Sequence, residues 1–118
     1  MWGDGTDVRD FLYVADFAEG FLAAVERHAE ADPINIVSGV ASSINDAVRI
    51  ILALEGYQPR LSYQPDQPSV GKARMLDGSK ATRVLGFTAR TNLEEGLRKT
   101  MAWYKATLAD RRAVCVSG

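Results

Sequence analysis

Residues 2–26 constrain the fold of this chain more than any other segment. They read WGDGTDVRDFLYVADFAEGFLAAVE, in which two glycines set a tight turn and Arg9 precedes residues that favour a strand. From Asp16 onward apolar residues recur at helical spacing, and the Asp16 carboxylate is expected to cap the first free amides of that helix. A turn, a strand and an amphipathic helix in this order predict an α/β protein.

The rest of the chain continues the alternation of strands and helices. Short strands are expected at residues 34–37, 61–63 and 72–76, the first two of them parallel because a helix lies between them. Further helices are expected between Ser43 and Gly56, between Asp77 and Gly86, and from Thr91 or Asn92 as far as residue 109. The first of them is opened by a capping box of Ser43 and Asp46. The predicted fold is therefore mixed α/β, with about four helices and a small sheet that includes a parallel pair.

Size, charge and cysteine content limit the classes of protein to consider. A chain of 118 residues forms one domain by the usual size range, and we expect residues 1–109 to fold and residues 110–118, which lack periodicity, to form a flexible tail. A net charge of −1 gives no bulk attraction to nucleic acid or to a membrane surface. No secretory signal is visible, and the lone Cys115 cannot form an internal disulfide, which favours the cytoplasm.

Residues able to do chemistry are scarce. The sequence contains no glycine-rich phosphate loop, and no group of histidine, cysteine and carboxylate residues has metal-ligand spacing. The single histidine, His28, stands among charged residues near the end of a predicted helix, where a solvated or capping role is expected. We therefore predict no catalytic residue and no metal site, and look instead for binding residues.

Two residues near the start of the chain are candidates for binding. Arg9 has a planar guanidinium that suits two oxygens of a phosphate at once, although a simple ion pair with Asp7 or Asp10 explains it equally well. Trp2 stands at the turn, where its indole can stack on a base or merely pack against the protein. Both alternatives stay open at the level of sequence.

Three further candidates lie in the second half of the chain. Lys72 and Arg74 alternate on a predicted extended run, so both can face one anion or line a solvated edge. Asp66 stands in a Pro-Asp loop, where it can accept a hydrogen bond from a ligand hydroxyl or base edge, or cap the turn.

Three blocks of sequence together resemble a known family. The run WGDGTDVRDFLYV, the block QPDQPSVGKARMLDGSKATRVLGF and the terminal NLEEGLRKTMAWY come in the same order as in the C-terminal half of the extended short-chain dehydrogenases, or NAD-dependent epimerases and dehydratases, that act on nucleotide sugars. Within that family the first block resembles the GDP-L-fucose synthases most. The resemblance implies the fold of such an enzyme's substrate-binding part, without its cofactor domain.

The resemblance also implies roles for the candidate residues. In the family the tryptophan and arginine of the first block help to hold the nucleotide diphosphate, and they correspond to Trp2 and Arg9. The aspartate of the Pro-Asp loop corresponds to Asp66. Two departures weaken the match, because the loop's lysine is Gln64 and its glycine is Gln67 in this chain. Lys72 or Arg74 is a candidate to replace the lost charge.

The family's catalytic equipment is not found in the sequence. Its enzymes bind NAD(P) through a glycine-rich turn and transfer protons with a Tyr-x-x-x-Lys pair, and neither motif occurs here. The first hypothesis is therefore a substrate-binding fragment of an NAD(P)-dependent nucleotide-sugar epimerase, reductase or dehydratase, which binds a GDP- or UDP-sugar but no cofactor by itself. The alternative is a stand-alone, non-enzymatic module that binds a nucleotide sugar or self-associates.

A homo-oligomer is expected under either hypothesis. In the family the first helix and strand pack partly against the cofactor domain. In this chain an apolar patch around Phe11, Phe17 and Phe21 would then face water. Because large apolar patches rarely stay exposed, we expect a second copy of the chain to cover it.

Overall fold

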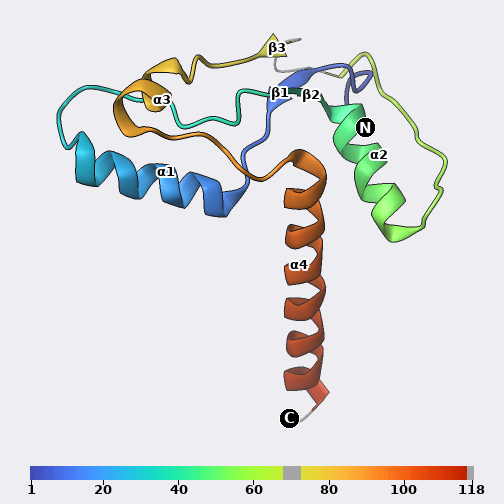
Figure 1. Cartoon of the computed structure of the whole chain (residues 1–118). Coiled ribbons are helices and arrows are strands. Elements are labelled where there is room, and N and C mark those ends of the chain that lie inside the picture. Colours follow the sequence, from blue (N-terminus) through green and yellow to red (C-terminus); the bar gives the residue numbers. More distant parts are fainter. Residues whose placement is uncertain (68–72, 117–118) are drawn as a thin grey trace.

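The computed structural model describes residues 1–67 and 73–116, and it describes side chains as far as residue 108. Within those residues the chain forms four helices and a small mixed sheet (Figure 1). The elements in chain order are β1 (Val8–Asp10), α1 (Val14–Arg27), β2 (Ala41–Ser43), α2 (Ile44–Glu55), β3 (Ala73–Arg74), α3 (Ser79–Leu85) and α4 (Leu93–Val116). The predicted fold class is confirmed. The expected domain boundary at residue 109 stays a prediction, and α4 continues as helix past it.

The sheet is built around β1. This strand pairs antiparallel with β2, where Val8 lies opposite Ser43, and parallel with β3, where Arg9 lies opposite Arg74. The sheet therefore includes a parallel pair, as expected, but the pair is β1 with β3 and not residues 34–37 with 61–63. It joins segments more than sixty residues apart, and it places two arginines in register on neighbouring strands.

Helix α2 begins and ends as its sequence predicts. The Ser43 hydroxyl accepts a hydrogen bond from the amide of Asp46 at 3.0 Å, and the Asp46 carboxylate accepts one from the amide of Ser43 at 3.1 Å. Gly56 ends the helix in the left-handed conformation with φ at 64°, where a side chain would be strained. These local signals need only a few neighbouring residues, which is why the sequence is sufficient to find them.

Two expected strands are absent from the described residues. Residues 34–37 run without a strand partner between α1 and α3, because their side chains are used in packing. A β-carbon built on Gly20 of α1 would lie 2.6 Å from Cγ2 of Ile36, and one on Gly78 would lie 2.6 Å from Cγ2 of Val37. Residues 61–63 are not a strand either, and pairing in that region is limited to isolated bridges from Gln64 to Trp2 and Gly3.

Asp16 was expected to cap α1, but the structure shows that it links two distant segments instead. The helix begins two residues earlier, at Val14, so that Asp16 lies in its first turn. Its buried carboxylate accepts hydrogen bonds from the amides of Arg90 and Thr91 at 3.0 and 2.8 Å, and from the Thr91 hydroxyl at 3.1 Å. Asp16 thus ties the start of α1 to the segment that leads into α4.

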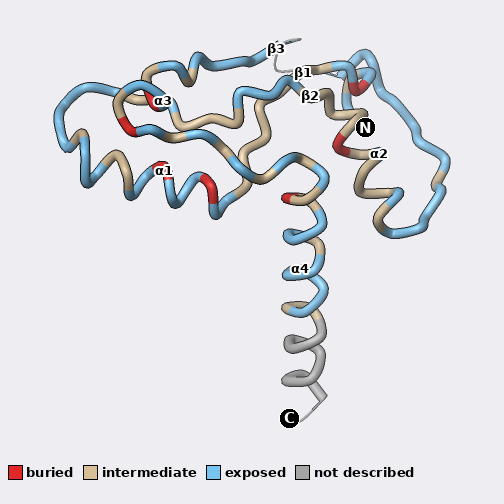
Figure 2. The backbone as a smooth tube through the Cα atoms, viewed as in Figure 1, coloured by how far each residue is buried: buried red, intermediate tan, exposed pale blue. Residues whose placement is uncertain are grey.

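Little of the described structure is fully buried. The buried apolar residues are Ala47, Ala81 and Leu85, and most positions along the chain are intermediate or exposed (Figure 2). The molecule is flat and open, with extents of 47 × 44 × 23 Å, and most of α4 stands away from the body (Figure 1). Helix α1 buries Asp16 and Gly20 on its inner side and leaves a wide apolar face in water.

Candidate functional site

The strongest candidate site lies where β1 and β3 run side by side. Arg9 and Arg74 are partners in a parallel register, so that their side chains leave the sheet on the same face. Two guanidinium groups at adjacent positions repel each other unless an anion lies between them. The sheet thus brings together two of the cations that the sequence singles out.

The guanidinium of Arg9 is held in place by its own strand. It donates hydrogen bonds to the carbonyl of Val8 at 2.7 Å and to Oδ2 of Asp7 at 3.1 Å, and its side chain is 22% exposed. The ion pair with Asp7 is one of the two that the sequence allowed. The other candidate, Asp10, instead accepts the amides of Ser38 and Gly39, both at 2.8 Å. Arg9 is thereby fixed in position and still reaches solvent.

The turn that carries Trp2 is anchored on both sides. Gly3 donates its amide to the carbonyl of Gln64 at 2.9 Å, and the carbonyl of Gly5 accepts the amide of Asn45, at the start of α2, at 2.9 Å. Gly5 has φ at 75°, a backbone conformation in which any other side chain would be strained, and a β-carbon there would also displace the side chain of Asn45. Trp2 is left 69% exposed on this fixed backbone.

Asp66 lies beside this turn. The amide of Gln67 donates to the carbonyl of Gln64 at 3.1 Å, which closes a turn around Asp66. The bridge between Trp2 and Gln64 places the backbone of Trp2 opposite a residue two positions before that aspartate. Lys72 lies outside the described residues. Of the four described candidates, Arg9 and Arg74 are partners in the sheet, whereas Trp2 and Asp66 both lie near the bridge at Gln64.

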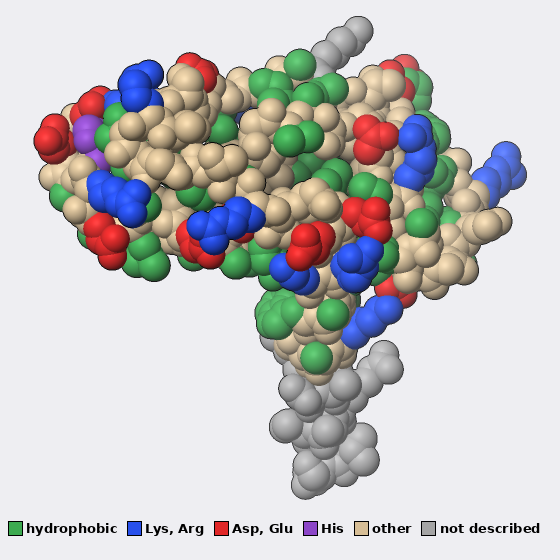
Figure 3. All heavy atoms as spheres, viewed as in Figure 1, with side chains coloured by type: hydrophobic (Ala, Val, Ile, Leu, Met, Phe, Trp, Pro, Cys, Tyr) green, Lys and Arg blue, Asp and Glu red, His purple; other side chains and the backbone are tan. Residues whose placement is uncertain are grey.

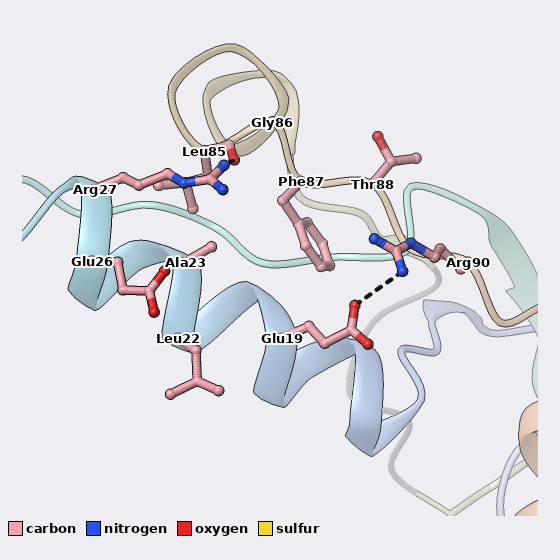
Figure 4. A pocket seen from close by; sticks show the side chains of 10 residues that line it. All are labelled: Glu19, Leu22, Ala23, Glu26, Arg27, Leu85, Gly86, Phe87, Thr88 and Arg90. Carbon is pink, nitrogen blue, oxygen red and sulfur yellow. Dashed lines mark hydrogen bonds and ion pairs between the residues drawn. The ribbon is translucent and has the colours of Figure 1, made fainter.

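A separate cavity of about 440 Å³ lies between α1 and the segment that follows α3 (Figure 4). Arg27 reaches across it to donate to the carbonyl of Leu85, and Arg90 lies 3.6 Å from the carboxylate of Glu19. Sequence reasoning did not find this cavity, because the residues on its two sides are about sixty positions apart. The carboxylates of Glu19 and Glu26 line the same cavity and offset the charge of the two arginines, so it is the weaker candidate for an anion site.

None of the strand-to-helix junctions in the described residues carries the G-x-G-x-x-G pattern of a dinucleotide site. In a Rossmann-type site a glycine-rich turn between a strand and a helix brings the pyrophosphate to the free amides at the start of that helix. The connection from β1 to α1 is Phe11, Leu12 and Tyr13, with no glycine, and the carboxylate of Asp16 lies in the first turn of the helix. Of the other two strand-to-helix junctions, β2 runs directly into α2, whose first turn holds the carboxylate of Asp46. The connection from β3 to the short α3 contains Gly78, but there the Asp77 carboxylate accepts the amide of Ser79 at 2.9 Å.

Other kinds of site find no support in the described part of the chain. No group of three or more metal-ligating side chains occurs there. None of its helices has the length and apolar character needed to cross a bilayer. On the face drawn in Figure 3, acidic and basic side chains are interspersed rather than gathered into one patch.

Comparison with known proteins supports the family resemblance. Residues 1–38 match the model of the NAD dependent epimerase/dehydratase family. GDP-L-fucose synthase 1 of Arabidopsis thaliana is 28% identical over 111 residues, which cover 94% of this chain and 34% of that protein. The chain is therefore related to the NAD-dependent epimerases and dehydratases.

Solved structures agree with this relationship. UDP-glucose 4-epimerase of Thermotoga maritima, solved with UDP-glucose, matches with a TM-score of 0.84 and 31% identity over 92% of this chain and 35% of its own. The enzyme WbmF of Bordetella bronchiseptica, solved with NAD+ and UDP, matches with a TM-score of 0.77 and 34% identity over 93% of this chain and 32% of its own. The chain thus spans about a third of the length of the relatives it matches.

Proposed function

We propose that this chain is the nucleotide-sugar-binding part of an NAD(P)-dependent epimerase, reductase or dehydratase, and that it has no catalytic activity alone. Arg9 and Arg74 hold the diphosphate, with Lys72 as a further cation. Trp2 stacks on the base, and Asp66 accepts a hydrogen bond from a hydroxyl or base edge. NAD(P) belongs to the remainder of such an enzyme, and the nucleotide carries either uracil or guanine.

The observation that carries this proposal is the register of Arg9 with Arg74 across β1 and β3. A diphosphate offers oxygens to two adjacent guanidinium groups, and charge-assisted hydrogen bonds to phosphate are strong. Two related structures, the Thermotoga epimerase and WbmF, were solved with UDP-glucose and UDP. A nucleoside diphosphate is therefore the ligand class that the paired arginines and the exposed indole suit best.

Calorimetric titration of the purified chain with UDP, GDP and their glucose or mannose conjugates tests the proposal. We expect binding of at least one nucleotide, weakened tenfold or more by Arg9→Ala and by Arg74→Ala, because each substitution removes a charge-assisted contact of about 1.5–3 kcal/mol. Arg98→Ala is the matched control, since that arginine pairs with Glu94 on the surface of α4. Equal affinities in Arg9→Ala and the unchanged chain would refute the assignment.

A second candidate function is a non-enzymatic module that self-associates. The observation that favours it is the exposed apolar face of α1, whose large side chains are between 49% and 69% exposed. The titration separates the two functions, since a self-associating module with no nucleotide site gives no heat with any nucleotide. NADH oxidation by the purified chain would contradict both.

A further inference from the structure

One face of the sheet carries a row of three side chains, one from each strand. Side chains of residues that lie directly opposite each other on neighbouring strands leave the sheet on the same face. Arg9 of β1 lies opposite Arg74 of β3 on one side and opposite Ser42 of β2 on the other. The row therefore runs Ser42, Arg9, Arg74, and Ser42 is the member that has no part in the diphosphate site proposed for the two arginines.

The two serines at the end of β2 point to opposite faces of the sheet, because side chains alternate along a strand. The Ser43 hydroxyl is used in the cap of α2, where it donates to Oδ2 of Asp46 at 2.6 Å. The Ser42 hydroxyl makes no hydrogen bond to any residue that the structure describes. No buried side-chain nitrogen or oxygen in the described part of the chain lacks a partner, so this hydroxyl reaches solvent on the face of the arginines.

The neighbours of Arg9 differ along the strand and across the sheet. Along β1 its guanidinium is held by the carboxylate of Asp7 at 3.1 Å. Across the sheet its neighbours on this face are Arg74 and Ser42. A diphosphate bound by both arginines spans one strand-to-strand spacing of about 4.8 Å, and Ser42 lies one further spacing from Arg9. The Ser42 side chain is thus within reach of ligand oxygens that lie beside Arg9.

We infer that Ser42 is a third ligand-binding residue of this site, and that its hydroxyl donates a hydrogen bond to an oxygen of the bound nucleotide sugar. The oxygen belongs to the phosphate next to Arg9 or to a hydroxyl of the sugar attached to it. A serine suits both partners, since its hydroxyl is a donor and an acceptor. This inference rests on the proposed function, because the two arginines are what place the ligand on this face.

Two substitutions of nearly identical shape isolate the contribution of the hydroxyl. Ser42→Thr keeps it, whereas Ser42→Val replaces it with a methyl group, and both new residues are β-branched and favour a strand. Both variants are titrated calorimetrically with UDP and UDP-glucose, or with GDP and GDP-mannose, whichever pair the unchanged chain binds. We expect Ser42→Thr to bind within about twofold of the unchanged chain and Ser42→Val to bind about tenfold more weakly, the loss typical of one hydrogen bond to a charged group.

The two ligands of a pair distinguish the two kinds of oxygen. Weaker binding of both by Ser42→Val assigns the contact to a phosphate, and weaker binding of the sugar conjugate alone assigns it to the sugar. Urea unfolding checks that both variants keep the stability of the unchanged chain. Equal affinities of the threonine and valine variants for both ligands would overturn the inference, and they would leave the proposed function standing where Arg9→Ala still weakens binding. Absence of nucleotide binding by the unchanged chain would overturn both.

Discussion

Asp16 shows how one residue decides the relative position of two helices. Burial raises the pKa of its carboxyl, but hydrogen bonds from the backbone and side chain of Thr91 and from the backbone of Arg90, with the charge of Lys99, outweigh burial. The net result is a pKa below the ordinary value. The folded state therefore holds this carboxyl ionised and fully bonded, which makes Asp16 a stabilising link rather than a strained one.

Asp16→Asn is expected to lower the free energy of unfolding by about 2 kcal/mol at pH 7, because charged hydrogen bonds are replaced by weaker neutral ones. Since the folded pKa is depressed, the contribution of Asp16 is complete above its ordinary value of 3.8 and is lost as the pH falls from there through the folded pKa. The unchanged protein and the variant should thus converge in stability toward pH 3. Urea unfolding at pH 3, 4, 5 and 7 measures this, and a constant difference would contradict it.

At the scale of secondary-structure elements, Gly20 determines how closely two other segments pack against α1. A β-carbon at this position would lie 2.6 Å from Ile36 and 3.0 Å from Phe87. The missing side chain is what lets residues 34–37 and the segment after α3 approach α1. A glycine in the middle of a helix is otherwise unfavourable, so its presence is explained by this close packing.

Gly20→Ala is therefore expected to destabilise the fold by about 1–3 kcal/mol through overpacking, instead of stabilising the helix. Gly96 in α4 provides the matched control, because a β-carbon there would meet Tyr13 at 3.4 Å, an ordinary contact distance. Gly96→Ala should be neutral or stabilising by up to about 1 kcal/mol. Thermal unfolding measures the stability of both variants. Equal stability changes would contradict the prediction, because they would show that Ile36 and Phe87 can move to accommodate a methyl group at residue 20.

The sequence predicted those elements whose signals are local. The capping box of Ser43 and Asp46, the left-handed Gly56 and the stop at Gly86 each depend on residues within a few positions. It failed for residues 34–37, where strand-favouring isoleucine and valine pack against α1 and α3 instead of pairing in a ladder. Strand propensity says only that a side chain suits the surface of a sheet. Whether a segment forms a strand also depends on a neighbouring strand to pair with, and that strand comes from a distant part of the sequence.

The candidate site was predictable in its residue types but not in its geometry. Arginine next to a glycine turn indicates phosphate binding, and the Asp7 ion pair was one of the alternatives. The register of Arg9 with Arg74 joins segments 65 positions apart, and nothing local in either segment encodes it. The cavity lined by Arg27 and Arg90 was missed for the same reason, since only the fold brings α1 and the segment after α3 together.

The whole molecule has a thin core for its length. Its radius of gyration is 17.8 Å, whereas about 13.5 Å is usual for a compact domain of this size. Three apolar residues, Ala47, Ala81 and Leu85, are fully buried within the described part of the chain. Because apolar burial is the main stabilising term in folding, we expect contacts that cover the exposed apolar face of α1 to add much to the stability of this chain.

The unfolding temperature should consequently depend on protein concentration. If two chains fold together, mass action raises the melting temperature as the concentration increases, and over a hundredfold range the added stabilisation is about 2.7 kcal/mol per dimer. For a domain of this size that corresponds to a rise of roughly 10 °C. The dependence should vanish in Phe21→Glu, which places a charge on the exposed apolar face of α1. Scanning calorimetry from 5 to 500 µM makes the measurement. A melting temperature that stays constant across that range would contradict the prediction, because it would show that the small core stabilises the fold without contacts between chains.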